Sequence, residues 1–114
     1  MRIWYQSFVD PIEQAPYIEL LCSRLASLSS PQTVVDFFGM SPPVRFFHPI
    51  SEYRCGGVAI RAALQAQAEG YDAFVIGNFQ GPGLTECRAS VDIPVIGLEA
   101  TMLLPALWVA RSDW

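Results

Sequence analysis

The stretch that decides the fold is Tyr71–Glu99, which reads YDAFVIGNFQGPGLTECRASVDIPVIGLE. Two apolar runs within it, Ala73–Ile76 and Ile93–Leu98, show no polar alternation, which is typical of parallel strands buried on both faces. The connection between them carries the turn Gly81-Pro82-Gly83 and is long enough for a short helix, so the stretch predicts a βαβ unit. Ligands of such sheets bind beyond the carboxyl ends of the strands. The segment 78–80, which follows the first run, is therefore where a site is expected.

The rest of the chain repeats this alternation of strand and helix. Strands are predicted at Arg2–Phe8, Thr33–Phe38, Ala73–Ile76 and Pro94–Leu98, and helices at Ala15–Leu28, Glu52–Glu69, Leu84–Ala89 and Ala100–Arg111. Ser51 suits the N-cap of the second helix and Gly70 its C′ position. The order predicts one α/β domain over residues 1–114: a four-stranded parallel sheet of flavodoxin-like order 2-1-3-4, with helices on both faces.

Helical spacing of large apolar residues predicts which side of each helix faces the sheet. For the first helix the inward set is Tyr17, Leu20, Leu21, Leu25 and Leu28. For the second it is Tyr53, Gly57, Ile60 and Leu64, with Gly56 and Gly57 letting the helix approach closely.

The last predicted helix, 100–111, is apolar on every side. Pro105 should kink it, and the apolar residues around it are Met102, Leu103, Leu104, Leu107, Trp108 and Val109. A helix of this kind is normally buried all round. Either a partner subunit covers it, or the sequence is one half of a longer architecture. We expect a homodimer or larger assembly that forms through 100–111.

Composition excludes several classes of protein. The chain is 52% hydrophobic and has a net charge of −4, and its basic residues are arginines spread singly, so no basic stripe for nucleic acid is present. It has no apolar run of membrane-spanning length and begins directly with a strand, so we expect a cytoplasmic protein that does not bind membranes. Cys22, Cys55 and Cys87 are irregularly spaced, which argues against a disulfide framework or a zinc site and favours a role as small apolar fillers.

The predicted sheet order places two polar clusters side by side, because strands 1 and 3 are neighbours at the topological switch point. Gln6 and Ser7 end the first strand, and Asn78, Phe79 and Gln80 follow the third. Each residue also has a structural alternative. Asn78 could stabilise a turn, Phe79 could pack in the core, and Gln80 could lie in a solvated loop. Gln6 and Ser7 could simply end their strand.

Two further ionisable residues are weaker candidates. His48 titrates near neutral pH and could act as a general acid or base, but it lies in a proline-rich loop among apolar neighbours. Glu99 follows a strand at the start of a predicted helix, where a carboxylate is stabilised by the helix dipole. A capping role for Glu99 is favoured over a catalytic one.

The stretch from Tyr71 to Ala100 resembles the first-domain signature of the aspartate/glutamate/hydantoin racemase family. In that signature a strand ends in Gly-Cys-Phe, and an Asp-Pro-Gly-Leu turn, an arginine-containing helix and a Pro-Val-x-Gly strand closed by Glu-Ala follow. The matching residues here are Gly77, Phe79, Pro82-Gly83-Leu84, Arg88, Ile93-Pro94-Val95, Gly97 and Glu99-Ala100. The resemblance covers this whole chain but only the N-terminal half of the family's two-domain architecture.

The resemblance implies cofactor-independent proton transfer, without a metal, at a carbon next to a carboxylate or carbonyl. In the family, two thiols, one from each domain, flank that carbon. Asn78 stands at the first-domain cysteine position, and Gly81 stands where the turn aspartate usually is. An amide is neither acid nor base near neutral pH. The implied function is therefore an isomerase of the racemase type that is inactive or altered as this short chain.

The same resemblance assigns Asn78 to the catalytic position and implies a small carboxylate or hydantoin-like substrate. The sheet order predicts that Gln6, Ser7, Phe79 and Gln80 bind that substrate. Two alternatives remain open. The chain could be a non-catalytic module that binds small carboxylates, or a self-associating fragment of a longer enzyme.

Overall fold

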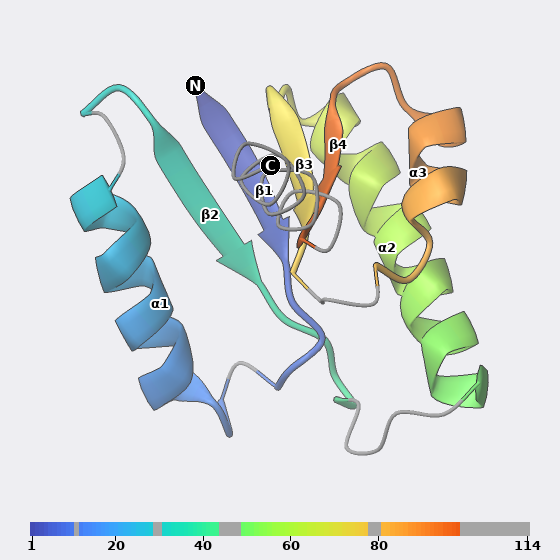
Figure 1. The fold of residues 1–114 in the computed structure, drawn as a ribbon, viewed down its shortest axis with the longest axis horizontal. Helices are drawn as coiled ribbons and strands as arrows, with labels where there is room; N and C mark the ends of the chain where they lie inside the picture. The colour runs from blue at the N-terminus through green and yellow to red at the C-terminus, as the bar shows by residue number, and fades with distance from the viewer. Residues whose placement is uncertain (11, 29–30, 44–48, 78–80, 99–114) are drawn as a thin grey trace, which may run out of the picture.

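A computed structural model of the chain describes residues 1–10, 12–28, 31–43, 49–77 and 81–98 (Figure 1). Its strands are β1 (Arg2–Gln6), β2 (Val34–Phe38), β3 (Ala73–Ile76) and β4 (Val95–Gly97), and its helices are α1 (Ala15–Leu28), α2 (Pro49–Ala68) and α3 (Leu84–Ser90). The helix predicted over 100–111 lies outside the described residues. None of the described helices is long and apolar enough to cross a membrane.

The four strands form one parallel sheet in the order β2-β1-β3-β4, which confirms the predicted topology. The register places Gln6 beside Phe38 on one side and Ile76 on the other, with Gly97 beside Ile76. These residues form the last paired row at the carboxyl edge of the sheet. The site was predicted at the ends of two of these strands, β1 and β3.

Helices flank both faces of the sheet, as predicted. Figure 1 shows α1 beside β2 on one side, with α2 and α3 on the other. Tyr5 lies on the α1 face, where its ring stacks on Phe37 with centroids 4.7 Å apart. Burial, and then the nearby Tyr17 of α1, raise the pKa of Tyr5. Trp4, the next residue along β1, lies on the α2 face and belongs to the main core.

Local signals account for the ends of α2. The helix begins at Pro49, earlier than the predicted start, because proline has no N–H to leave unpaired and its φ suits the first helical position. At the other end Gly70 adopts φ +82°, as expected of a C′ glycine. The N–H groups of Gly70 and Tyr71 donate to the carbonyls of Gln67 and Ala66, at 3.2 and 3.0 Å. This is the Schellman pattern, and it directs the chain into β3.

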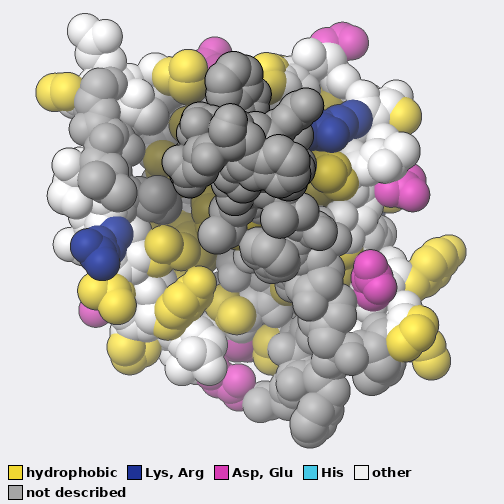
Figure 2. All heavy atoms as spheres, viewed as in Figure 1, with side chains coloured by type: hydrophobic (Ala, Val, Ile, Leu, Met, Phe, Trp, Pro, Cys, Tyr) yellow, Lys and Arg dark blue, Asp and Glu magenta, His cyan; other side chains and the backbone are white. Residues whose placement is uncertain are grey.

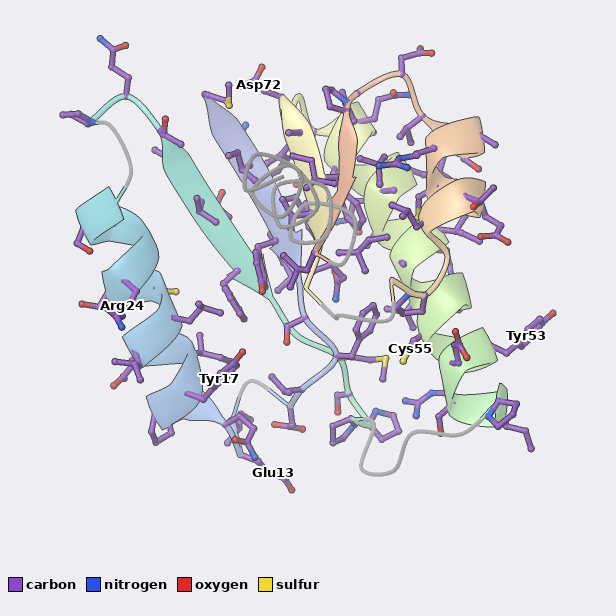
Figure 3. All side chains as sticks on the ribbon, viewed as in Figure 1. Glu13, Tyr17, Arg24, Tyr53, Cys55 and Asp72 are labelled. Carbon is purple, nitrogen blue, oxygen red and sulfur yellow. The ribbon has the colours of Figure 1, made fainter. Side chains whose placement is uncertain are left out.

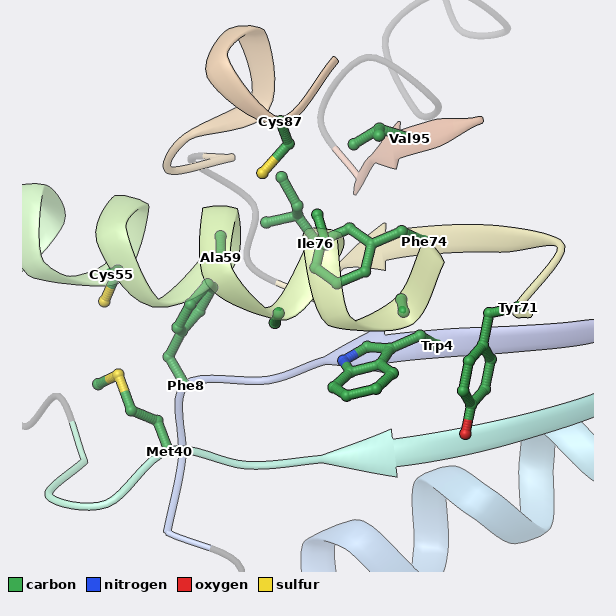
Figure 4. Close-up of a cluster of buried hydrophobic side chains, with 13 residues drawn as sticks. Trp4, Phe8, Met40, Cys55, Ala59, Tyr71, Phe74, Ile76, Cys87 and Val95 are labelled. Atoms are coloured by element: carbon green, nitrogen blue, oxygen red, sulfur yellow. The ribbon is translucent and has the colours of Figure 1, made fainter. Parts of the chain in front are cut away.

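The predicted inward face of α2 is wrong for Tyr53 and Leu64, whereas Ile60 is half-buried and packs against the core as predicted. Tyr53 is 87% exposed and Leu64 is also exposed, whereas the small residues Cys55, Ala59, Ala63 and Ala66 are buried against the sheet. The reason is volume. The sheet supplies large side chains to this layer, Trp4 and Phe74 among them, and packing at normal protein density leaves room only for small side chains from the helix (Figure 4).

The inward face predicted for α1 is also partly wrong. Tyr17 and Leu20 are exposed, and Ile18 and Leu21 are half-buried. This helix packs on β2, which is an edge strand, so only a narrow strip of its surface meets the sheet. The side chains of Leu25 and Leu28 lie outside the described set.

A polar cluster ties the strands together at the opposite, amino edge of the sheet. The Tyr71 hydroxyl donates to Asp36 Oδ2 at 2.6 Å, and the Arg2 guanidinium lies over the Tyr71 ring at 4.2 Å. The backbone N–H of Arg2 donates to Asp72 Oδ2 at 2.7 Å. The hydrogen bond to Asp36, followed by burial, raises the pKa of Tyr71. Since this cluster is remote from the carboxyl edge, we interpret it as structural.

Candidate functional site at the carboxyl edge of the sheet

Gln6 ends β1 as a buried amide, with only 2% of its surface exposed. Its Oε1 accepts a hydrogen bond from Trp4 Nε1 at 3.0 Å. Its Nε2 donates to the carbonyls of Ser7 at 2.8 Å and Gly39 at 3.1 Å. The side chain therefore links the core aromatic Trp4 to the segments that follow β1 and β2. A role for Gln6 in binding substrate stays a prediction.

Sequence reasoning missed this network, although a signal for it was present. Trp4 and Gln6 are two apart on one strand, so their side chains must lie on the same face. An amide that follows a core tryptophan at this spacing points into the same layer and needs internal partners.

Ser7 is also buried, at the start of the loop that leaves β1. Its N–H donates to the Phe38 carbonyl at 2.8 Å, which extends the pairing of β1 and β2 by one residue. Its Oγ accepts from the Val9 N–H at 3.4 Å. Ser7 is thus held at the carboxyl edge, where it was expected.

Asn78, Phe79 and Gln80 lie outside the described residues, as do His48 and Glu99. Gly77, the described residue just before them, donates its N–H to the Gln6 carbonyl at 2.7 Å. A Cβ at Gly77 would lie 2.3 Å from Tyr5 Cε1 and 2.9 Å from the Gln6 carbonyl oxygen. Only glycine therefore lets the end of β3 lie this close to the end of β1.

After residues 78–80, the turn Gly81-Pro82-Gly83 leads into α3. Gly81 and Gly83 have φ of +63° and +75°, a region that favours glycine. The Leu84 N–H donates to the Gly81 carbonyl at 3.1 Å, and the Cys87 N–H donates to the Gly83 carbonyl at 2.8 Å. The turn is therefore closed by backbone hydrogen bonds of its own.

At Gly83 and Gly97 a larger residue would clash with neighbouring atoms. A Cβ at Gly83 would lie 3.0 Å from both the Cα and the carbonyl oxygen of Gly56 in α2. A Cβ at Gly97 would lie 2.9 Å from Leu84 Cδ2. These contacts pack α3 closely against both α2 and β4. The glycines matched to the racemase signature thus set backbone spacing, whatever chemistry the site performs.

An open groove of about 790 Å³ lies beside the turn, between α2 and the start of α3. It contains no described residue of the predicted site. Its walls are apolar, with carboxylates at the rim, and its lining residues are Pro49, Glu52, Tyr53, Gly56, Gly57, Ile60, Gly81, Pro82, Gly83, Leu84, Thr85 and Glu86.

The cysteines in the described part of the chain are not exposed nucleophiles. Cys55 and Cys87 are completely buried, and Cys22 is half-buried, all with free thiols. Burial, and then the charge of Glu86, raise the pKa of Cys87 to about 11. Burial also raises the pKa of Cys55. These thiols stay protonated at neutral pH, which agrees with their predicted role as small apolar fillers.

The buried thiols lead to a labelling prediction. We expect Cys55 and Cys87 to resist a thiolate-selective reagent in the folded protein at pH 8 and to react fully in urea, with Cys22 reacting first. Mass spectrometry of peptides after timed labelling measures the order. The raised pKa of Cys87 favours the folded state below the ordinary thiol pKa, and this contribution is lost as pH rises through about 11. Native labelling of Cys87 ahead of Cys22 would contradict the assignment.

Groups that could hold a metal ion are also absent from the described ranges. No three of their histidine, cysteine, aspartate and glutamate side chains gather at one point.

The described residues form an α/β domain with a parallel sheet. In such a domain, a ligand is expected to bind at the carboxyl edge of the sheet. Among solved structures, allantoin racemase from Klebsiella pneumoniae has this fold, with a TM-score of 0.68 and 22% sequence identity. The aligned region covers 85% of the present chain and 39% of that chain. At this identity the match shows a shared fold, and it agrees with the resemblance noted for residues 71–100. Neither a family model nor a curated protein matches the sequence.

Proposed function

We propose that this chain is the first α/β half of a cofactor-independent racemase or isomerase that acts at a carbon next to a carboxylate or carbonyl. The observation that carries the proposal is the match to an allantoin racemase over 85% of the chain. The chain spans about two-fifths of the length of that protein, with 39% of it covered. Residues 1–114 would then form one domain of a two-domain enzyme.

The role of this half is to supply the carboxyl edge that binds the substrate. Ser7 and Gly77 are held there by backbone hydrogen bonds to the neighbouring strands. Asn78 occupies the position of the family's first thiol, and Phe79 and Gln80 complete the proposed binding segment. Burial raises the pKa of Cys55 and of Cys87, so neither of these thiols is suited to act as the base for proton abstraction.

A second candidate is a non-catalytic module that binds small carboxylates. The observation that favours it is the same pair of buried thiols, together with the amide at position 78. The two candidates share a binding edge and differ only in chemistry. Binding and proton exchange must therefore be measured separately.

Binding is tested by titrating the 15N-labelled chain with allantoin, hydantoin and aspartate. We expect amide shifts at Ser7, Gly77 and the 81–83 turn, because these groups border the proposed site. Asp72 is an internal control, since it lies at the amino edge of the sheet. An absence of shifts at millimolar ligand, or shifts confined to the amino edge, would remove both candidates.

Chemistry is tested by Asn78→Cys, with Asn78→Ser as a matched control that cannot act as a base. If the missing thiol limits activity, deuterium exchange at the reacting carbon should rise by roughly 10²-fold in the cysteine variant only. Proton NMR of the substrate in D₂O measures the rate against buffer alone. Exchange equal in both variants, with binding retained, would leave the non-catalytic module as the function.

A further inference from the structure

The inference concerns the outward side of α2, which carries an exposed apolar stripe. The stripe consists of the exposed residues Ile50, Tyr53 and Leu64 and the half-buried residues Gly57 and Ile60. Successive members are separated by three, four, three and four positions, which is the spacing of core residues in a helix that packs along another helix. Ile50 and Tyr53 are 78% and 87% exposed, so none of the residues that the structure describes covers this end of the stripe.

This stripe is additional to the face that α2 uses for its own domain. The buried small residues of α2 point to the sheet, whereas the large residues Ile50, Tyr53 and Leu64 are exposed. Figure 3 shows Tyr53 directed away from the sheet, while Cys55 lies on the inner side. In Figure 2, apolar side chains project at the margin where α2 lies in Figure 1, with acidic side chains beside them. A helix that is apolar on both sides requires a partner on both.

The surface beside the stripe can admit another helix. On the α3 side it opens into the groove of about 790 Å³. At the middle of the stripe, a Cβ placed on Gly57 would meet no atom within 4 Å. The absence of a side chain at Gly57 therefore leaves a depression in the surface of the stripe. A side chain from a partner helix could therefore enter between Tyr53 and Ile60.

The charges beside the stripe identify the partner. On one flank lie Arg54 and Arg61, both exposed. On the other flank Glu52 and Glu86 line the groove. When two identical helices pack in parallel about a two-fold axis, the basic flank of each meets the acidic flank of the other. An antiparallel pair would bring like charges together.

We propose that the outer stripe of α2 binds the same stripe of a second copy of this chain, in a parallel two-fold pair. Arg61 of each copy then lies opposite Glu86 of the partner subunit. Arg54 already donates a hydrogen bond to the Pro42 carbonyl, so it is a less suitable residue for a test. The contact is separate from 100–111 and does not depend on the proposed function.

The first test is sedimentation equilibrium of the full chain over the micromolar range. We expect a dimer whose dissociation constant rises by roughly tenfold or more in Tyr53→Glu. Leu20→Glu is the matched control, because Leu20 is an equally apolar residue exposed on α1. Circular dichroism checks that both variants fold, which exposed positions should allow.

The second test fixes the arrangement by exchanging charges. Arg61→Glu and Glu86→Arg should each weaken the dimer, and the double variant should recover most of the wild-type dissociation constant. A monomeric wild type, a dimer unaffected by Tyr53→Glu, or an equal loss in Leu20→Glu would overturn the proposal. Failure of the double variant to recover would overturn it too, because the parallel pairing predicts that recovery.

Discussion

Trp4→Ala is expected to lower the free energy of unfolding by about 3–5 kcal/mol. The Trp4 ring stacks on Phe38 with centroids 3.6 Å apart and meets the edge of Tyr71 at 5.2 Å. It thus joins β1 to β2 and to Tyr71, two residues before β3, inside the layer covered by α2. Truncation removes these contacts, leaves a cavity, and deprives the Gln6 amide oxygen of its donor. Urea unfolding followed by circular dichroism measures the loss, since the substitution removes one of the chain's three tryptophan fluorophores.

Trp4→Phe separates packing from hydrogen bonding. The smaller ring keeps most of the stacking but cannot donate to Gln6, so it should cost clearly less than the alanine variant, about 1–3 kcal/mol. Equal losses in the two variants would mean that the hydrogen bond, rather than the stacked ring, accounts for the effect. A loss below about 1 kcal/mol for Trp4→Ala would contradict the described core.

Gly83→Ala should be the other strongly destabilising change, by about 2–4 kcal/mol. It combines two costs at one position. The φ of +75° is unfavourable for alanine, and the new Cβ would lie 3.0 Å from the backbone of Gly56. Backbone cannot rotate away as a side chain can, so α3 would have to shift from α2. Chemical denaturation at one fixed, low protein concentration provides the measurement.

Two other glycines of the chain separate these costs. Gly70 has φ +82° but open space around its Cβ position, so Gly70→Ala carries only the backbone strain. Gly57 has open space and an ordinary helical φ, so Gly57→Ala should be neutral or stabilising by up to about 1 kcal/mol. The described packing of α3 on α2 requires the order of loss Gly83, then Gly70, then Gly57. If Gly83→Ala cost no more than Gly70→Ala, the close approach would be disproved.

Much of the fold could be predicted because its signals are local. The bounds of α1 and β3 agree with the sequence interpretation residue by residue. The sheet order followed from the alternation of strand and helix, since right-handed crossovers leave few topologies open. The C′ role of Gly70 followed from its place after a helical pattern, and the structure shows the expected φ.

The candidate site was predictable only in its position. That the ends of β1 and β3 lie side by side follows from topology, and the Gly77 N–H bonded to the Gln6 carbonyl bears this out. The internal partners of the Gln6 amide were not foreseen, because they depend on the carbonyls of Ser7 and Gly39 reaching the same point in space. The roles of Asn78, Phe79 and Gln80 remain predictions.

The sequence by itself determined the element order, the parallel sheet and the edge at which chemistry is expected, because these depend on runs and turns within a short stretch of chain. Only the tertiary structure decided which face of α2 is buried. Periodicity shows that large apolar residues share a face, but the space beneath the helix depends on what the sheet contributes. Trp4 and Phe74 fill that space, so the small residues Cys55 and Ala59 pack inward and Tyr53 is left outside. Packing volume, a property of two layers together, cannot be obtained from either segment alone.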